Sequence, residues 1–367
     1  MRTIRGLPLL AAALIGCGGS TGTADIPTAS MEASENACTV HRPTCYSIAD
    51  IGPVIDDWFE NTSLGVNSHG VVVGTTPRWS TDPDPRRAFS FKHGTVSPLL
   101  GLGGGTSEAR AVNEWGLAVG GSLDPEGHYR ATSYFNGVVT DLGTLDGTNS
   151  WSWQVNDFGF AVGNGYVSGV AHAAGFFLGK VIDLGSIGGP TYANDVNDLF
   201  EVVGTGQLAD GAWSGFVRHG SKLVPFGAFG IPTPSTARAI NNRGTACGSW
   251  TTADGSYFRR AFLLHRDGSV VDLPDLGYMY SYCEDVNDQG VAVGFSDDGQ
   301  GSWRAVTWTS ASEPPIDLNP RLVPARPDVF LYAASKISAS GNITVYGWSF
   351  TDAAVEGYLL TPTACPE

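Results

Sequence analysis

The stretch Asn113-Glu-Trp-Gly116-Leu-Ala-Val-Gly120 decides the fold of this 367-residue chain, because six further stretches repeat its pattern. The pattern is an Asn, a Gly three residues later, and a second Gly four residues after the first. Its turns lie at Asn67 and Gly70, Asn113 and Gly116, Asn156 and Gly159, Asn197 and Phe200, Asn241 and Gly244, and Asn287 and Gly290, and a degenerate copy begins at Ser338. Successive copies are separated by 46, 43, 41, 44, 46 and 51 residues. A period of about 45 residues is typical of propellers and repeat arrays.

Each repeat contains four short candidate strands. The first ends at the Asn, and the Asn-x-x-Gly segment then makes a tight turn, because Asn and Gly both tolerate positive φ. The second strand is apolar, as in Val71–Val73, the third begins with a basic residue, and the fourth ends in Asp-Leu-Gly or a relative, as in Asp183–Gly185. Four antiparallel strands per repeat make one propeller blade. Seven copies therefore predict an all-β, seven-bladed β-propeller.

The two ends of the repeat region complement each other. Tyr46–Gly52 resembles a fourth strand with no first three before it, and Gly357–Leu360 resembles a third strand with no fourth after it. We predict that they complete the last blade together, which removes free sheet edges. This layout places the first strand of each blade innermost, where its small Ala and Ser residues would suit a crowded axis. An open β-solenoid is the alternative, and it would not need complementary ends.

The N-terminus resembles a bacterial lipoprotein signal. Arg2 and Arg5 precede an apolar run that ends in Leu14-Ile15-Gly16-Cys17, which is similar to a lipobox. The resemblance implies a signal peptide over residues 1–16, lipidation of Cys17, and export to the bacterial outer membrane or cell surface; a plain secretory signal is the alternative. Residues 17–37 are rich in small polar residues and predict a flexible tether. Residues 38–367 then form the propeller.

The net charge of the chain limits which molecules it can bind. The formal net charge is −15 and no Lys/Arg cluster is present, which excludes binding to a phosphate backbone. We expect a monomer that contacts the membrane only through its lipid anchor.

Export permits disulfides, and we expect Cys38 or Cys45 to join Cys365, with a local Cys38–Cys45 loop as the alternative. Cys247 and Cys283 occupy small or apolar positions of the repeat, so we expect buried side chains there.

The repeats resemble the bacterial HAF-repeat family of extracellular proteins. The family couples Asp-Leu-Gly-x-x-Gly-Gly, the Asn-Gly turn and His-Ala-Phe. Asp183–Gly189 matches the first motif closely, and Asp141–Gly147 matches it in part. The third motif is mostly Arg-Ala-x here, with a His only at His172. The resemblance covers residues 46–362 and carries no catalytic motif, so it implies a repeat architecture and no activity.

Two sets of side chains are candidates for binding. One basic residue recurs at the start of the third strand, and we expect each to pair within its own blade rather than to form a ring around an anionic ligand. Tryptophans in or near loops can stack on sugars or anchor partners, or can simply pack between blades. The candidate ligand-binding residues are Trp151, Trp153, Trp115, Arg87, Arg130, His172, Arg260 and Arg304, with Trp151 and Trp153 foremost.

No motif assigns a reaction. Asp285, Asn287 and Asp288 alternate before Gly290 like a calcium loop, but the twelfth-position Glu is missing and the repeat places them at a turn. We therefore predict no metal, no cofactor and no catalytic residue. The sequence favours a surface-displayed binding module for a glycan or a protein. The alternatives are a carboxylate-dependent glycan hydrolase or lyase, and a purely structural role in the cell envelope.

Overall fold

The computed structural model describes residues 44–54, 64–76, 86–252, 258–278 and 280–366. The chain divides into two compact units, Met1–His41 and Arg42–Glu367. The first unit lies outside the described residues, and so do the predicted signal peptide, the tether, Cys17 and Cys38. No helix among the described residues is long and apolar enough to cross a membrane.

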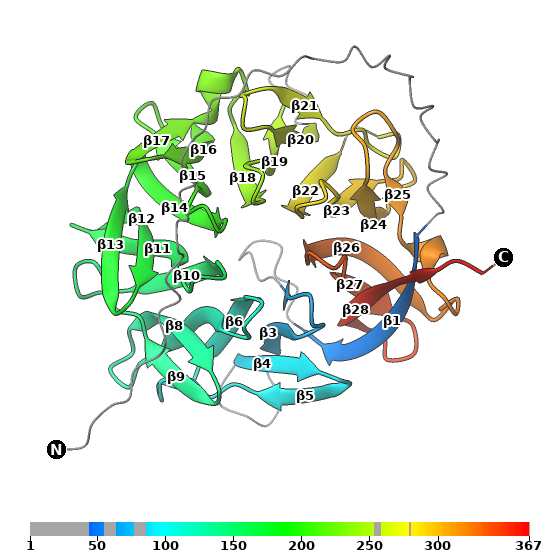
Figure 1. Ribbon diagram of the computed structural model, residues 1–367, viewed down its shortest axis with the longest axis horizontal. Helices are drawn as coiled ribbons and strands as arrows, with labels where there is room; N and C mark the ends of the chain where they lie inside the picture. The colour runs from blue at the N-terminus through cyan, green and yellow to red at the C-terminus, as the bar shows by residue number, and fades with distance from the viewer. Residues whose placement is uncertain (1–43, 55–63, 77–85, 253–257, 279, 367) are drawn as a thin grey trace, which may run out of the picture. The chain divides into compact units, whose positions relative to one another are not determined.

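The second unit consists of seven four-stranded antiparallel sheets (Figure 1). We number these blades 1 to 7 along the chain. Blade 1 contains β2 (Gly65–Val66), β3 (Val72–Thr76), β4 (Arg87–Lys92) and β5 (Thr95–Pro98). Blade 2 contains β6 (Ser107–Val112), β7 (Ala118–Leu123), β8 (Tyr129–Phe135) and β9 (Val138–Asp141). Blade 3 contains β10 (Ser150–Val155), β11 (Ala161–Val167), β12 (Val170–Phe177) and β13 (Lys180–Gly185).

The remaining blades follow the same order. Blade 4 contains β14 (Gly188–Val196), β15 (Val202–Leu208), β16 (Trp213–His219) and β17 (Lys222–Pro225). Blade 5 contains β18 (Ser235–Ile240), β19 (Ala246–Thr251), β20 (Arg259–Leu264) and β21 (Val270–Asp272). Blade 6 contains β22 (Ser281–Val286), β23 (Ala292–Asp297), β24 (Trp303–Trp308) and β25 (Ile316–Asp317). Blade 7 contains β26 (Val329–Ile337), β27 (Ile343–Ser349), β28 (Ala354–Ala364) and β1 (Thr44–Pro53), and short 3₁₀ helices cover Phe226–Phe229 and Asn319–Arg321.

The predicted seven-bladed propeller is therefore confirmed, and the ring is closed as the complementary ends predicted. β1 pairs antiparallel with β28 and supplies the fourth strand of blade 7, with Ile48 opposite Leu360. A disulfide joins Cys45 to Cys365, which is one of the two long-range pairings that the sequence left open. Blade 7 in turn contacts blade 1 through β26 and β2. The strand order excludes the open solenoid.

The hydrophobic core lies between adjacent blades. One cluster joins Phe160, Val162 and Ala173 of blade 3 to Ala193 and Phe216 of blade 4, and similar clusters fill the other junctions. Blades 5 and 6 also share a disulfide between the buried residues Cys247 and Cys283. The sequence predicted that these two positions are buried but not that they are bonded to each other. Their repeat positions face each other across neighbouring blades, which explains the pairing.

The innermost strands correct one sequence expectation. The small residues Ala109, Ser152, Ala193 and Ala237 do not line the axis but are fully buried. Ser152 donates its Oγ–H to the carbonyl of Gly120 in the neighbouring blade, at 2.6 Å. Because strand side chains alternate between two faces, the intervening residues of each innermost strand turn toward the axis instead. In blades 2 to 5 the residues on either side of these small ones are polar or aromatic.

The two glycines of the repeat serve different physical needs. The first, as in Gly159, has a positive φ of 79°, which a tight turn requires and which most side chains disfavour. Phe200 takes the same left-handed conformation in blade 4, with φ at 60°. The second glycine lies where two strands approach closely. A Cβ at Gly163 would collide with the carbonyl oxygen of Trp151, and equivalent collisions recur in blades 2, 4, 5 and 6.

In blades 1 to 6 the Asn of the repeat ties its turn to the next blade. Asn67 Oδ1 accepts the backbone N–H groups of His69 and Val71, at 3.1 and 3.0 Å, and so closes its own turn. Its Nδ2 donates to the backbone oxygen of Asn113, at 3.0 Å. The same donation links Asn113 to Asn156, Asn156 to Asn197, Asn197 to Asn241, Asn241 to Asn287, and Asn287 to Ser338. We call this series the asparagine ring.

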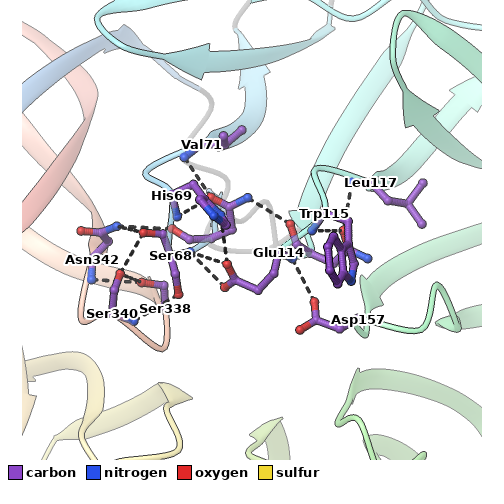
Figure 2. A network of polar contacts seen from close by, with 12 residues as sticks. Ser68, His69, Val71, Glu114, Trp115, Leu117, Asp157, Ser338, Ser340 and Asn342 are labelled. Atoms are coloured by element: carbon purple, nitrogen blue, oxygen red, sulfur yellow. Dashed lines mark hydrogen bonds and ion pairs between the residues drawn. The ribbon is translucent and has the colours of Figure 1, made fainter. Parts of the chain in front are cut away.

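Blade 7 closes the asparagine ring with a different residue. Ser338 occupies the Asn position and has no amide to donate. Asn342, four residues later, donates its Nδ2 to the backbone oxygen of Asn67 at 3.3 Å, and its own N–H bonds to Ser338 Oγ. Two side chains thus divide the task that one Asn performs in the other blades (Figure 2). The degenerate seventh copy is therefore part of the same network.

Replacing Asn156 with Ala should destabilise the propeller by about 3 kcal/mol. The change removes the bond to Asn197 O at 3.1 Å and leaves the N–H groups of Phe158 and Phe160 without their acceptor. Each buried polar group left unpaired costs about 1–3 kcal/mol. Urea unfolding at equilibrium measures the loss. Leu199→Ala, at an exposed position of the neighbouring turn, should change the free energy of unfolding by less than about 0.5 kcal/mol. Equal losses for both variants would contradict the stabilising role proposed for the asparagine ring.

Candidate functional site

Two cavities lie along the innermost strands. One, here called the turn-side cavity, has a volume of about 240 Å³ and is lined by the Asn-Gly turns and the last residues of those strands. The other, here called the aromatic pocket, has a volume of about 590 Å³ and lies at the earlier residues of β6, β10, β14 and β18. Its lining consists of Arg86, Glu108, Arg110, Tyr129, Trp151, Trp153, Tyr192, Asn194, Thr205, Trp213, Thr236 and Arg238.

The aromatic pocket follows from a simple sequence rule. In blades 2 to 5, the fifth and third residues before the Asn of the turn lie on the axis-facing side of the innermost strand. These pairs are Glu108 and Arg110, Trp151 and Trp153, Tyr192 and Asn194, and Thr236 and Arg238. The residues between them, such as Ser152, are the small buried ones. Because side chains alternate along a strand, one face of this six-residue segment packs against the neighbouring blade and the other lines the pocket.

Aromatic rings form the walls of the pocket. Trp151 stacks on Tyr129, with ring centroids 5.1 Å apart and planes 18° from parallel, and meets Tyr166 edge-on at 6.2 Å. On the next blade Tyr192 stacks on Trp213 at 6.3 Å and 21°. Trp213 retains 39% of its surface exposed. The pocket therefore offers flat apolar faces held at fixed angles by neighbouring rings.

Trp153 is held more rigidly than Trp151. Its Nε1–H donates to Asn164 Oδ1 at 2.9 Å, and the Arg110 guanidinium lies 4.3 Å from its ring centroid. A cation over a tryptophan face is stabilised by the ring quadrupole. Trp153 is therefore a lining residue whose ring is fixed by two neighbouring side chains.

The carboxylate of the aromatic pocket is buried between two arginines. Glu108 accepts from Arg86 Nη1 at 2.9 Å and from Arg110 Nη2 at 2.6 Å. Burial raises the pKa of Glu108, but the two guanidinium groups outweigh burial, so the pKa lies below its usual value. Glu108 is therefore ionised at neutral pH with both oxygens engaged. Such a group fixes two arginines but is a poor proton donor.

Polar groups complete the far side of the pocket. Asn194 Nδ2 donates to the carbonyl of Ala237 at 2.7 Å and to Thr205 Oγ1 at 3.1 Å. Arg238 places its Nε 3.6 Å from Glu284 Oε2. The pocket thus combines hydrogen-bonding groups at its edge with aromatic faces on its walls, which is the usual composition of a small-molecule site.

The turn-side cavity contains a buried charge cluster. Asp195 accepts the N–H of Ile240 from the next blade at 2.7 Å, and Asp285 accepts that of Ile337 at 2.9 Å. Lys336 Nζ lies 3.8 Å from Asp285 Oδ1. Burial, partly offset by Lys336, raises the pKa of Asp195 to about 7. Burial lowers the pKa of Lys336, but the carboxylates outweigh it, so its pKa is raised. The two aspartates link blades through these backbone hydrogen bonds.

Three basic residues of the third strands pair with carboxylates of their own blades. Arg130 Nε lies 3.0 Å from Asp124 and 3.6 Å from Asp141. His172 lies 3.0 Å from Asp183, and Arg304 lies 2.9 Å from Asp298. Arg87 is the first residue of β4 in blade 1, and Arg260 is the second residue of β20 in blade 5. None of Arg87, Arg130, His172, Arg260 and Arg304 lines either cavity.

The candidate tryptophans lie at opposite ends of the innermost strands. Trp151 and Trp153 line the aromatic pocket, whereas Trp115 lies in the β6–β7 turn and is 75% exposed. The structure adds partners that sequence reasoning missed, chiefly Tyr129 and Tyr192, and it places Trp213, one of the tryptophans near loops, in the same pocket. Within the described part of the chain, no three His, Cys, Asp or Glu side chains are grouped so as to hold a metal ion. Asp285 and Asn287 serve blade-to-blade hydrogen bonding instead.

Comparisons with known proteins give loose structural matches. No family model and no curated protein matches the chain, so the resemblance to the HAF-repeat family stays a prediction. TolB from Acinetobacter baumannii is similar, with a TM-score of 0.43, 8% identity and 81% of each chain covered. A gluconolactonase from Xanthomonas campestris has a TM-score of 0.36 and 14% identity, over 88% of this chain and 99% of its own.

A lectin is also among the similar structures. The fucose-recognising, six-bladed lectin from Aleuria aurantia has a TM-score of 0.38 and 11% identity, over 88% of this chain and 99% of its own. No ligand or activity is transferred from these proteins to this chain.

Replacing Asp195 with Asn should change how stability depends on pH. The folded-state pKa of about 7 exceeds the unfolded value of about 3.9, so the folded wild type binds more protons between these values. Wild-type stability gained from this group is therefore lost as pH rises from about 4 to about 7, by at most about 1.4 kcal/mol per pH unit. Urea unfolding between pH 4.5 and 8 should show Asp195→Asn becoming relatively more stable as pH rises.

The matched control is Asp267→Asn. Its carboxylate is exposed, and hydrogen bonds from Ser269 lower its pKa, so its contribution changes only in more acidic solution. Its stability profile should stay parallel to wild type between pH 5 and 8. A parallel profile for Asp195→Asn as well would show that the buried carboxyl is ionised throughout this range.

Proposed function

We propose that this protein is an exported, lipid-anchored binding module whose aromatic pocket holds a carbohydrate. The observation that carries the proposal is the pairing of stacked aromatic faces with hydrogen-bonding groups in a cavity of about 590 Å³. The apolar C–H face of a sugar ring fits against a flat aromatic ring, and its hydroxyls need donors and acceptors at the edge. Trp151 and Trp213 supply the faces, and Asn194 and Arg238 supply the edge.

The pocket favours binding over hydrolysis. Among its described lining residues Glu108 is the single carboxylate, whereas glycoside hydrolysis ordinarily uses two carboxyl groups about 5–9.5 Å apart. The alternative, a glycan hydrolase or lyase, would have to use carboxylates of the turn-side cavity, which are Glu114, Asp157, Asp195, Asp198, Asp285 and Asp288. The buried ones among them are Asp195 and Asp285. Both accept backbone N–H bonds from the neighbouring blade, which is a structural use of a carboxylate.

A glycan array probed with the full-length chain, with product analysis of every hit, tests the proposal. Binding without turnover supports it. Turnover that Asp195→Asn abolishes in a folded protein would establish the hydrolase or lyase instead. A blank array would reject carbohydrate binding and leave a protein partner or a scaffolding role.

Replacing Trp151 or Trp213 with Ala should weaken glycan binding by at least about 30-fold. Truncating a central aromatic anchor costs about 2 kcal/mol or more of binding free energy. Titration calorimetry with the strongest array ligand measures the change, and urea unfolding confirms that the variants fold. The matched control is Trp115→Ala, because Trp115 lies outside the pocket. A loss of binding in Trp115→Ala alone would place the ligand on the turn side.

The anchoring part of the proposal rests on residues 1–37. A lipobox Cys is the acceptor for the lipid, so Cys17→Ser should release the protein from the membrane fraction of a bacterial host and abolish incorporation of labelled palmitate. Cys38→Ser keeps a Cys at position 17 and should leave both unchanged. Retention of the label in Cys17→Ser would refute lipidation at this residue.

A further inference from the structure

We propose that the turn side of blades 2 to 4 docks a segment of another protein that is both apolar and basic. The docking surface is a row of exposed apolar side chains two residues after the Asn of each turn. Its members are Trp115, Phe158 and Leu199, which Phe200 adjoins, and we call these four residues the apolar row. The apolar row lies at the opposite end of the innermost strands from the aromatic pocket, so this inference is independent of the proposed carbohydrate binding.

The apolar row is more exposed than the packing of the turns requires. Trp115 and Phe158 keep 75% and 63% of their surfaces exposed, and Leu199 keeps 57%. In the other four blades the same repeat position holds polar residues, which are His69, Arg243, Gln289 and Ser340. The turn therefore does not need an apolar side chain there. Apolar groups gathered on adjacent blades are typical of an interaction site.

Hydrogen bonds hold the three turns edge to edge. The N–H of Glu114 donates to Asp157 Oδ1 at 2.9 Å, as Figure 2 shows, and the N–H of Asp157 donates to Asp198 Oδ1 at 2.9 Å. Each of these residues directly precedes a member of the apolar row. The row therefore runs from blade 2 to blade 4 on a backbone whose spacing is fixed.

Phe200 occupies a backbone position that favours Gly. Its φ of 60° lies in the left-handed region, which a bulky side chain disfavours. The other six copies have Gly at this position, namely Gly70, Gly116, Gly159, Gly244, Gly290 and Gly341. The Phe200 ring stacks on Phe158, with centroids 5.6 Å apart and planes 23° from parallel, and lies 5.5 Å from the buried Phe160 ring. The apolar row is thus continuous with the core between blades 3 and 4.

Carboxylates along the inner edge of the apolar row determine the charge of the partner. They are Glu114, Asp157 and Asp198, and all three line the turn-side cavity. Each accepts a backbone N–H; Glu114 also lies 3.3 Å from His69, and Asp198 also accepts the Asn242 amide at 3.0 Å. Within the described residues, none of the three carboxylates forms an ion pair with a Lys or Arg.

These carboxylates repel one another. Partial burial raises the pKa of Asp157, and the charges of Asp198 and Glu114 raise it further, despite the hydrogen bond from the Glu114 N–H. A cationic side chain placed along this edge would reduce that repulsion. The partner segment therefore gains from carrying Lys or Arg beside its apolar residues.

The other charges on this end of the molecule leave the inner edge acidic. Asp288 adds a fourth carboxylate at the same repeat position in blade 6, and Arg243 is the one guanidinium two residues after a repeat Asn. Lys180 and Lys222 begin the outermost strands of blades 3 and 4. At longer range, the formal net charge of −15 attracts a basic partner and opposes both a second copy of this chain and an anionic lipid surface.

A random dodecapeptide library displayed on phage and selected on the immobilised full-length chain supplies the probe. We expect the enriched peptides to combine aromatic or aliphatic residues with an excess of Lys and Arg over Asp and Glu. Titration calorimetry at about 150 mM salt then measures the affinity of the most enriched peptide, which should fall as the salt concentration rises.

Phe158→Ser should weaken binding of this peptide at least about tenfold, because it removes a central apolar contact. The matched control is Phe350→Ser. Phe350 has the same exposed fraction, 63%, but lies between β27 and β28, at the opposite end of the strands in blade 7. The control should bind as the wild type does, and urea unfolding confirms that both variants fold.

Asp157→Asn tests the acidic edge without removing a hydrogen-bond acceptor. Blade 5 already uses an amide in this way, because Asn242 Oδ1 accepts the N–H of Asp198 at 2.7 Å. The variant should bind the peptide at least about threefold more weakly, with a smaller dependence on salt. Asp210→Asn is its control, since Asp210 is exposed, accepts the N–H of Ala212 at 3.0 Å and lies between β15 and β16 at the opposite end. This control should leave the affinity unchanged.

Several results would overturn the inference. They are a failure to enrich any peptide, enrichment without an excess of basic residues, and equal affinity in Phe158→Ser and wild type. A peptide whose binding is lost in Trp213→Ala but kept in Phe158→Ser would occupy the aromatic pocket instead. Sedimentation velocity in the Cys17→Ser background tests for a second copy as the occupant, and a dimer that Phe158→Ser abolishes would likewise overturn the inference.

Discussion

The side-chain amide of one asparagine per repeat is the interaction on which this molecule depends. Its oxygen closes a four-residue turn, and its nitrogen reaches the backbone of the next blade, as Asn156 does toward Asn197. A residue with only an acceptor or only a donor could do one of these tasks but not both. In blade 7 the two tasks are divided, because the short Ser338 hydroxyl accepts the Asn342 N–H and the Asn342 amide donates to Asn67.

The same constraint positions the candidate site. Once the Asn fixes the turn, and a glycine such as Gly163 lets the second strand approach the first, the register of the innermost strand is set. The side chains on one face of that strand must then be small, as that of Ser152 is, to fit against the neighbouring blade. The other face is free to vary, and Trp151 and Trp153 lie there. Framework and binding residues therefore alternate along one short segment.

Much of the architecture could be predicted from the sequence, because its cause is local and repeated. The period, the turn glycines and the complementary ends each follow from a few residues, and together they gave the blade number and the closure by β1. The small residues of the innermost strand were placed at the axis wrongly. Their size shows that the position is crowded, but size alone cannot distinguish crowding at an axis from crowding between blades.

The site was harder to predict, since its parts come from several blades. Trp151 and Trp153 were identified because two tryptophans stand close together in one strand. Tyr192 and Trp213 come from different strands of the next blade, and Arg86 reaches Glu108 from the blade before. Aligning all copies on the Asn and comparing the fifth and third residues before it would have revealed most of this set. The Cys247–Cys283 bond likewise depends on which repeat positions face each other.

The two ends of the innermost strands have different roles in this proposal. The turn side is held by the asparagine ring and by buried charges such as Asp195, whereas the aromatic pocket receives the ligand. Hydroxyl-radical footprinting of the full-length chain, with and without the strongest glycan ligand, tests this assignment most directly. We expect the ligand to reduce oxidation of Trp151, Trp153 and Trp213 and to leave oxidation of Trp115 unchanged. Protection of Trp115, with the three pocket tryptophans unchanged, would contradict it.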